Sequence, residues 1–269
     1  MSLRLRAVAL ALFAGAGVTR ISRAARGARG ASIDRSKIVD LTYTFDAHTI
    51  YWPTEPPFVR QVEHFGPQPG GWFYAAGTYA AHEHGGTHMD APVHFNRAGL
   101  TIDKVPLTQL IGPAAVIDFS PRAARDRDAT LNLDDLDRWE AAHGPLPDGA
   151  IVVARSGWGR FWPDRERYLG TAQPGDAAHL RFPGFALEAV DYLLTRRNVA
   201  ALAIDTASID PGVATDFAVH RRWLGANRPG FENVANAEQL PAAGATIFCI
   251  PMKIGEGSGA PARIFALLP

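Results

Sequence analysis

The sequence is poor in cysteine and has no excess of charge of either sign. Cys249 is the only cysteine among 269 residues, so an intramolecular disulfide and a cysteine-based zinc site are both excluded. It lies in the apolar run ATIFCIP, which favours a buried, inert thiol. Lys and Arg number 27, as do Asp and Glu, so the formal charge is zero. This balance gives no indication of a nucleic-acid partner or of an anionic membrane.

Residues 1–33 lack acidic residues and carry six arginines. Two arginines followed by the apolar run 7–18 resemble a secretory signal, while the later arginines also fit a transit peptide or a disordered arm. The run is too short to span a bilayer, so no membrane span is predicted. The location therefore stays open between cytoplasmic and exported, and this leader is excluded from the fold prediction.

Beyond the leader, strand and helix patterns alternate. Helical patterns with acids near the start and arginines or Gly-Pro at the end cover 130–147 and 183–199. Apolar runs typical of strands occupy 36–45, 113–120, 149–158, 200–208, 244–254 and 262–269. This order predicts a single α/β domain over residues 34–269, with a mixed sheet and flanking helices.

The stretch HEHGGTHMDAPVHF, residues 82–95, concentrates metal-binding side chains. His84 and His88 are four residues apart, a spacing that suits a helix, but the Gly85-Gly86 pair between them disfavours one by about 1 kcal/mol per glycine. In a flat strand their Cα atoms would lie about 13 Å apart, too far to share one ion comfortably. The chain is therefore predicted to bend at the glycines.

Beyond the bend, His88 and Asp90 are two apart and point the same way on an extended segment. Together with His84 they form a ligand set usual for catalytic zinc, manganese or non-haem iron. Ala91-Pro92 stiffens the exit from the motif. His94 follows closely, and an imidazole at this place is suited to act as general base and acid.

The spacing H-x-G-T-H-x-D-x-P-x-H in residues 84–94 resembles the signature of the metal-dependent cyclase-like hydrolases, which include kynurenine formamidases and isatin hydrolases. The resemblance extends from about residue 37 to the end. It implies a second ligand pair, which HRRWLGANRPGFEN supplies as His220 and Glu232. By this resemblance His84, His88, Asp90, His220 and Glu232 hold one or two divalent ions, with Asp90 bridging a pair, and His94 is the proton shuttle.

The resemblance also implies a swivelling β/β/α fold and a homodimer or homotetramer. Between His220 and Glu232, Gly225, Pro229 and Gly230 exclude a long helix, so Glu232 is expected on a loop. If that loop is displaced, three protein ligands hold a single ion.

Weaker signals surround these motifs. Trp52 and Trp72 are candidates for stacking on an aryl substrate, although packing within the protein explains them equally well. Thr206 and Ser208, at the end of a predicted strand, are candidates for substrate binding or for capping a turn. His82 is either an outer partner of a metal ligand or an exposed polar residue. The segment GEGSGAPAR lacks the Lys-Ser/Thr ending of a phosphate loop.

Taken together, these patterns predict a hydrolase that uses zinc or manganese to cleave a carbon–nitrogen bond. The expected substrate is an N-aryl formamide such as N-formylkynurenine, an intermediate of tryptophan catabolism, or a cyclic aryl amide such as isatin. A non-haem iron oxygenase is an alternative, but it leaves His94, His220 and Glu232 without roles. The other alternative is a non-catalytic metal- or ligand-binding protein of the same fold, which does not need His94.

Overall fold

The computed structural model describes residues 33–269, and residues 35–269 form one compact unit. The predicted leader, residues 1–33, lies outside the described residues except for its last residue. No helix among the described residues is long and apolar enough to cross a membrane.

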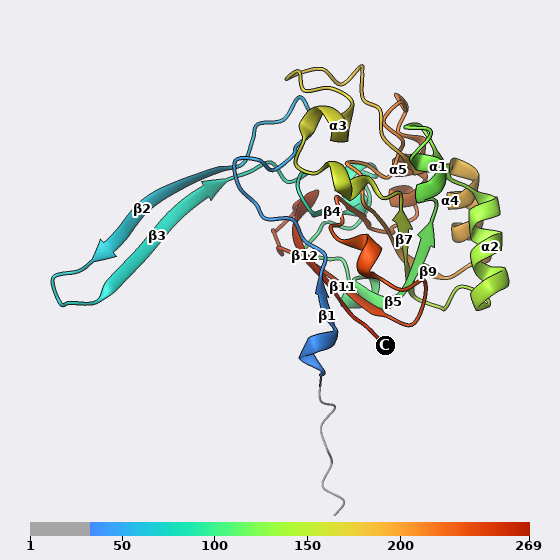
Figure 1. Ribbon diagram of the computed structural model, residues 1–269, viewed down its shortest axis with the longest axis horizontal. Helices are drawn as coiled ribbons and strands as arrows, with labels where there is room; N and C mark the ends of the chain where they lie inside the picture. Colours follow the sequence, from blue (N-terminus) through green and yellow to red (C-terminus); the bar gives the residue numbers. More distant parts are fainter. Residues whose placement is uncertain (1–32) are drawn as a thin grey trace, which may run out of the picture. The chain divides into compact units, whose positions relative to one another are not determined.

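Seven strands close into a barrel (Figure 1). Their order is β12 (Gly259–Leu267), β11 (Thr246–Pro251), β5 (Ile111–Asp118), β7 (Ala150–Arg155), β9 (Val199–Ile204), β10 (Gly230–Glu232) and β4 (His88–Asp90), which pairs back with β12. The four strands from β5 to β10 are parallel, and the remaining pairs are antiparallel. Strand β1 (Ile38–Asp40) adds to the outer edge of β12. The predicted mixed sheet is confirmed, and the swivelling arrangement stays a prediction.

Helices cover the parallel strands on one side (Figure 1). They are α2 (Leu133–His143), α4 (Leu187–Arg196) and α5 (Ala218–Gly225). Helix α2 begins with a reciprocal capping box between Asn132 and Asp135, which satisfies two backbone N–H groups that lack partners within the helix. Both long predicted helices are confirmed with shorter bounds.

Short elements complete the unit. They are α1 (Ser120–Ala123), α3 (Arg165–Leu169), the paired strands β6 (Thr130–Leu131) and β8 (Gly184–Phe185), and the 3-10 turns η1 (Arg35–Lys37), η2 (Pro92–His94), η3 (Leu107–Gln109), η4 (Trp158–Phe161) and η5 (Ala237–Gln239).

The core has two main parts, which the alternation of side chains along the strands separates. On β7, Ile151 and Val153 point into the barrel, while Val152 packs outward against the helices with residues such as Trp139. Cys249 lies fully buried inside the barrel, where burial raises the pKa of its thiol well above the usual value. The predicted burial of this thiol is confirmed.

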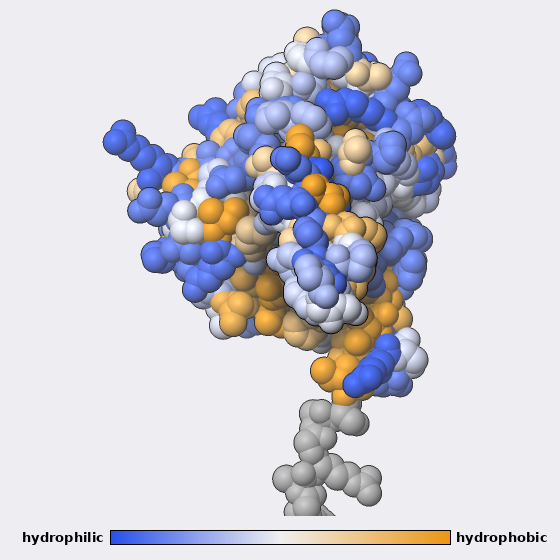
Figure 2. All heavy atoms as spheres, turned by 90° about the vertical axis from the view of Figure 1, so that its left-hand side faces the viewer, coloured by the Kyte–Doolittle hydropathy of each residue, from blue (hydrophilic) through white to orange (hydrophobic). Residues whose placement is uncertain are grey.

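A long hairpin formed by β2 (Val59–Pro67) and β3 (Phe73–Ala80) projects from the barrel (Figure 1). No sequence pattern predicted it. Nearly all of its residues are exposed, including Phe65, Trp72 and Phe73. Figure 2, which looks onto this side of the molecule, shows hydrophobic residues at the surface among polar ones. Within the described residues, the hairpin therefore leaves large apolar side chains exposed.

Candidate active site

The predicted bend at the paired glycines is present and brings the first ligand candidates together. Gly86 has φ of 57°, and a Cβ atom there would lie only 2.6 Å from the ring of Phe45. After this turn the chain enters β4. His84 Nδ1 lies 2.7 Å from Asp90 Oδ1, and His88 Nε2 lies 3.2 Å from the same oxygen. The glycines thus permit two imidazoles to converge on one carboxylate.

The second pair of predicted ligands arrives at the same place from two other elements. His220 Nε2, on α5, lies 3.1 Å from Asp90 Oδ2 and 3.2 Å from Glu232 Oε1. Glu232 ends β10, where it pairs in register with His88, and its Oε2 lies 3.4 Å from His88 Nε2. The expectation of a loop is wrong for Glu232. Gly230 does not prevent regular structure here, because it is the first residue of the short strand β10, which pairs with both β9 and β4.

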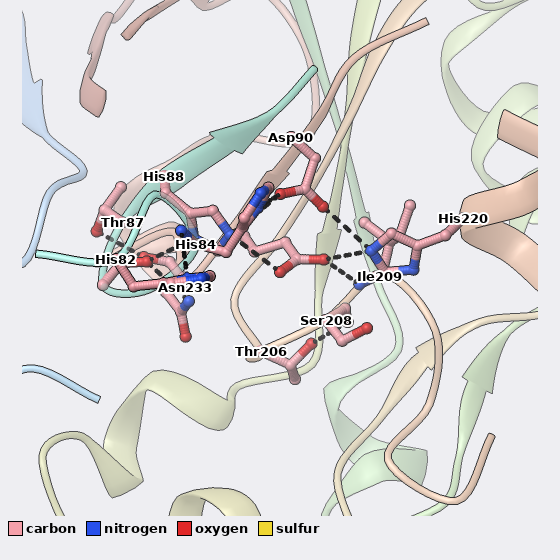
Figure 3. A network of polar contacts seen from close by, with 12 residues as sticks. His82, His84, Thr87, His88, Asp90, Thr206, Ser208, Ile209, His220 and Asn233 are labelled. Carbon is pink, nitrogen blue, oxygen red and sulfur yellow. Dashed lines mark hydrogen bonds and ion pairs between the residues drawn. The ribbon is translucent and has the colours of Figure 1, made fainter. Parts of the chain in front are cut away.

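These five side chains form two overlapping groups that could each hold a metal ion (Figure 3). Within each group, the potential ligand atoms lie within 4.8 Å of one another. One group is His84, His88 and Asp90, and the other is Asp90, His220 and Glu232. Asp90 belongs to both, so its carboxylate is placed to bridge two ions or to serve one.

Hydrogen bonds to outer partners turn the imidazoles inward. His88 Nδ1 donates to the carbonyl oxygen of Gly86 at 2.9 Å, and His220 Nδ1 lies 2.6 Å from the carboxylate of Asp210. Both outer partners accept, so each Nε2 directs its lone pair toward the carboxylates. His88 Nε2 is buried and has no hydrogen-bond partner among the residues that the structure describes. Buried lone pairs facing carboxylate oxygens fit a cation between them.

The electrostatics of the site also favour positive charge. Burial acts to lower the pKa of His88 and of His220, but the neighbouring carboxylates outweigh it and raise both. Burial acts to raise the pKa of Asp90, yet the surrounding imidazoles hold it well below its usual range. A carboxylate that stays ionised at such depth, as that of Asp90 does, is suited to a divalent ion.

His94 lies beside the ligand groups and belongs to neither of them. It comes from the turn η2, and its ring stacks on that of His84 with 3.8 Å between centroids. Burial, together with nearby imidazoles, lowers its pKa to about 4. The ring is therefore neutral at pH 7 and able to accept a proton.

A cavity of about 270 Å³ opens onto these residues. One part of its wall is aromatic and consists of Trp52, Phe95 and Phe217. The metal-ligand candidates and His94 also line the cavity, and the ring of Phe95 lies 4.8 Å from that of His220. Apolar side chains beside a few convergent polar groups are the usual composition of a small-molecule site.

The weaker candidates separate into two groups. Trp52 and Ser208 line the cavity, as does His82, whose Nε2 lies 3.0 Å from Glu55 Oε2. Thr206 is not in the cavity wall, because its hydroxyl donates to the carbonyl oxygen of Ser208 within a turn. Trp72 is not in the wall either, because it lies next to the turn of the projecting hairpin.

Several residues of the site were not predicted. Phe95 adjoins the motif and Phe217 precedes His220 by three, but neither position has a chemical signal in the sequence. Asp210 lies just beyond the predicted strand 200–208, two residues after Ser208. Its carboxylate also accepts from the backbone N–H groups of Val219 and His220, so it fixes the start of α5 as well as the imidazole.

A family comparison agrees with this geometry. The model of the putative cyclase family matches residues 39–211. The chain belongs to this family. The isatin hydrolase of Roseibium aggregatum is 35% identical to it over 207 residues, which are 74% of this chain and 77% of that protein. The kynurenine formamidase of Salinibacter ruber is 25% identical over 242 residues, which are 84% of this chain and 95% of that protein.

Solved structures of this cyclase family match the fold. Isatin hydrolase A from Ralstonia solanacearum has a TM-score of 0.77 at 32% identity, over 86% of this chain and 92% of that one. An isatin hydrolase bound to the product analogue thioisatinate has a TM-score of 0.77 at 30% identity, over 87% of this chain and 92% of that one. The predicted resemblance is confirmed, and with it the prediction of a hydrolase that acts on carbon–nitrogen bonds.

Proposed function

We propose that the protein is a divalent-metal-dependent amidohydrolase that opens the C–N bond of a cyclic aryl amide such as isatin. The observation that carries the proposal is the convergence of three imidazoles and two carboxylates in the wall of a cavity that aromatic side chains also line. The relatives named isatin hydrolase support the cyclic substrate, and those named kynurenine formamidase support an N-aryl formamide as the runner-up.

In this proposal His84, His88, Asp90, His220 and Glu232 hold one or two ions, either zinc or manganese. When bound, the ion supplies a Lewis acid that polarises the carbonyl and lowers the pKa of a water molecule. The donor set of imidazoles and carboxylates suits both metals.

The remaining chemistry is assigned to the chain's own side chains. His94 is neutral and held against His84, so it takes a proton from the attacking water and returns it to the leaving nitrogen. Trp52, Phe95 and Phe217 hold the aryl ring and exclude water from it. Ser208 is the polar group of the wall that we assign to orienting the substrate.

The test separates metal binding from proton transfer. His94→Ala should keep the metal content of the purified protein while hydrolysis of isatin or N-formylkynurenine falls by roughly 10²–10⁴-fold. The matched control is His82→Ala, which removes another imidazole of the cavity wall that lies outside both ligand groups and should lower the rate far less. Unchanged hydrolysis in His94→Ala contradicts the proton-transfer role, and a metal-free wild-type protein contradicts the metal dependence.

We also propose that the protein forms a homo-oligomer, most simply a homodimer, through the hairpin. Residues paired directly across the two strands point to the same face. The register therefore places Val62, Phe65, Phe73 and Tyr79 on one face and His64, with Tyr74, on the other. The rings of Phe65 and Phe73 contact each other at 5.1 Å yet stay exposed. A second copy of the chain, which carries the same face, is the proposed partner.

A further inference from the structure

His84 differs from the other two imidazoles in how its outward nitrogen is held. His84 Nε2 lies 2.9 Å from the hydroxyl of Ser258, and this hydroxyl lies 2.6 Å from Glu83 Oε2. Glu83 precedes His84 in the chain, whereas Ser258 is 174 residues away. The outer partner of His84 is thus a chain of two side chains instead of a single acceptor.

The donors and acceptors in this chain fix its direction. Glu83 Oε2 accepts the hydroxyl hydrogen of Ser258 at 2.6 Å. A carboxylate only accepts, and Glu83 Oε2 also accepts the backbone N–H of Ser258 at 2.9 Å. The hydroxyl has one hydrogen and donates it to Glu83. Its oxygen is therefore left to accept from His84 Nε2–H.

This position of the hydrogen determines the state of the other ring nitrogen of His84, Nδ1. With the hydrogen on Nε2, His84 Nδ1 presents a lone pair toward Asp90 Oδ1, 2.7 Å away. Two acceptors at this distance are stabilised by a cation between or beside them. His84 thus faces the first ligand group through Nδ1, whereas His88 and His220 face the carboxylates through Nε2.

The fold places Ser258 for this role. Gly259 starts β12 and pairs with Asp90, while Ala91 N–H donates to the carbonyl oxygen of Ser258 at 2.8 Å. A Cβ atom at position 259 would lie 2.4 Å from His84 Cε1, so glycine allows this backbone to pack against the imidazole. The glycine-rich segment GEGSGAPAR therefore brings the hydroxyl of Ser258 next to His84 Nε2, the ring nitrogen that does not face Asp90.

We propose that Glu83 and Ser258 are positioning residues that hold His84 in the Nε2–H tautomer and direct its Nδ1 to the metal. The proposal rests on the proposed metal-dependent function. Outer partners of metal-bound imidazoles typically change metal affinity by about 10–100-fold. Neither residue needs to touch the substrate.

The first test measures the affinity for Zn²⁺ and Mn²⁺ by competition with a chromophoric chelator. Ser258→Ala should bind about 10–100-fold more weakly than the wild type, and Ser258→Thr, which keeps the hydroxyl, should restore most of the loss. Ser120→Ala, at the start of α1, is the matched serine control and should bind as the wild type does. Equal affinity of Ser258→Ala and the wild type overturns the proposal.

A double-mutant cycle distinguishes positioning from general destabilisation. Because Glu83 and Ser258 act in one chain, Glu83→Ala combined with Ser258→Ala should weaken binding no more than the stronger single variant. Additive losses of metal affinity would mean that Glu83 and Ser258 act independently, and this result contradicts the proposal.

Nitrogen-15 spectra of histidine-labelled protein read the tautomer without any enzymatic activity. The wild type should show an Nε2–H of His84 that exchanges slowly with water, and Ser258→Ala should lose this protection. If the wild type binds neither ion, the proposed function fails. In that case the spectra still decide the positioning role, since a His84 that lacks a protected Nε2–H overturns it.

Discussion

At the scale of single residues, Gly86 carries a carbonyl oxygen on which two segments of the site depend. This oxygen accepts from His88 Nδ1 at 2.9 Å and from Asn233 Nδ2 at 2.8 Å. The N–H of Gly86 donates to the carbonyl of Ile50 at 2.9 Å. The left-handed φ of 57° sets the direction of all three bonds. One glycine therefore links the metal-ligand loop to the residue that follows Glu232 and to the cavity wall.

Replacing Gly86 with alanine should destabilise the fold and weaken metal binding together. The left-handed backbone costs an alanine about 1–2 kcal/mol, and the contact with Phe45 should add about 1–3 kcal/mol. Gly71→Ala is the matched control, since Gly71 has φ of 79° but no atom within 4 Å of the added Cβ. Urea unfolding measures both free energies of unfolding. Equal losses in the two variants contradict a role of the close packing.

The same scale shows which parts of the site a sequence can predict. His84, His88 and Asp90 lie within seven residues, so their spacing and the glycine bend indicate a shared site. Asp210 and Ser258 have no such local signal, because folding alone brings them behind the imidazoles that they hold. Outer partners of this kind depend on strand pairing, and single-sequence patterns do not contain it.

At the scale of elements, Glu140 connects the two long helices. Its carboxylate lies on α2 and accepts two hydrogen bonds from Arg197, each at 2.5 Å, just after α4 ends. It also accepts from the hydroxyl of Tyr192 and from the backbone N–H of Leu146. The side chain is only 13% exposed. The hydrogen bonds from Arg197 and these further groups lower its pKa to about 2.

Glu140→Gln should lower the free energy of unfolding by about 1–3 kcal/mol at pH 7. The folded-state pKa of about 2 is below the value near 4.3 of an unfolded chain, so the stabilisation is complete above pH 4.5 and disappears toward pH 2. The difference between variant and wild type, measured by urea unfolding, should therefore shrink over that interval. Asp137→Asn changes an exposed acid on α2 as the control. A difference that is constant from pH 7 to pH 3 argues against this linkage.

Elements with a clear period were predicted, and those without one were not. α2 and α4 show helical spacing with end signals, and β7 and β9 are continuous apolar runs of the kind buried on both faces. β10 has three residues, too few for a pattern, and its neighbours determine it. The hairpin lacks a regular alternation because a bulge shifts the register between Val62 and His64.

At the scale of the whole molecule, the exposed hairpin is flanked in the chain by residues that line the cavity. Tyr51 and Trp52 precede it, and His82 follows it, and all three line the cavity. An isolated two-stranded hairpin is only marginally stable in water. On one face of the hairpin Val62, Phe65, Phe73 and Tyr79 are each more than half exposed, so a second copy of the chain can bury a continuous apolar area there. Self-association would therefore order the hairpin and the part of the wall that adjoins it.

Replacing Phe65 and Phe73 with serine should convert the proposed oligomer to a monomer. The reason is that both rings lie on the same exposed face and supply much of the area to be buried. Light scattering coupled to size exclusion, at micromolar concentration, measures the mass. Leu107→Ser with Val213→Ser removes exposed apolar side chains outside the hairpin and should leave the mass unchanged. A monomeric wild type, or a hairpin variant of unchanged mass, contradicts the proposed interface, and circular dichroism checks that each variant is folded.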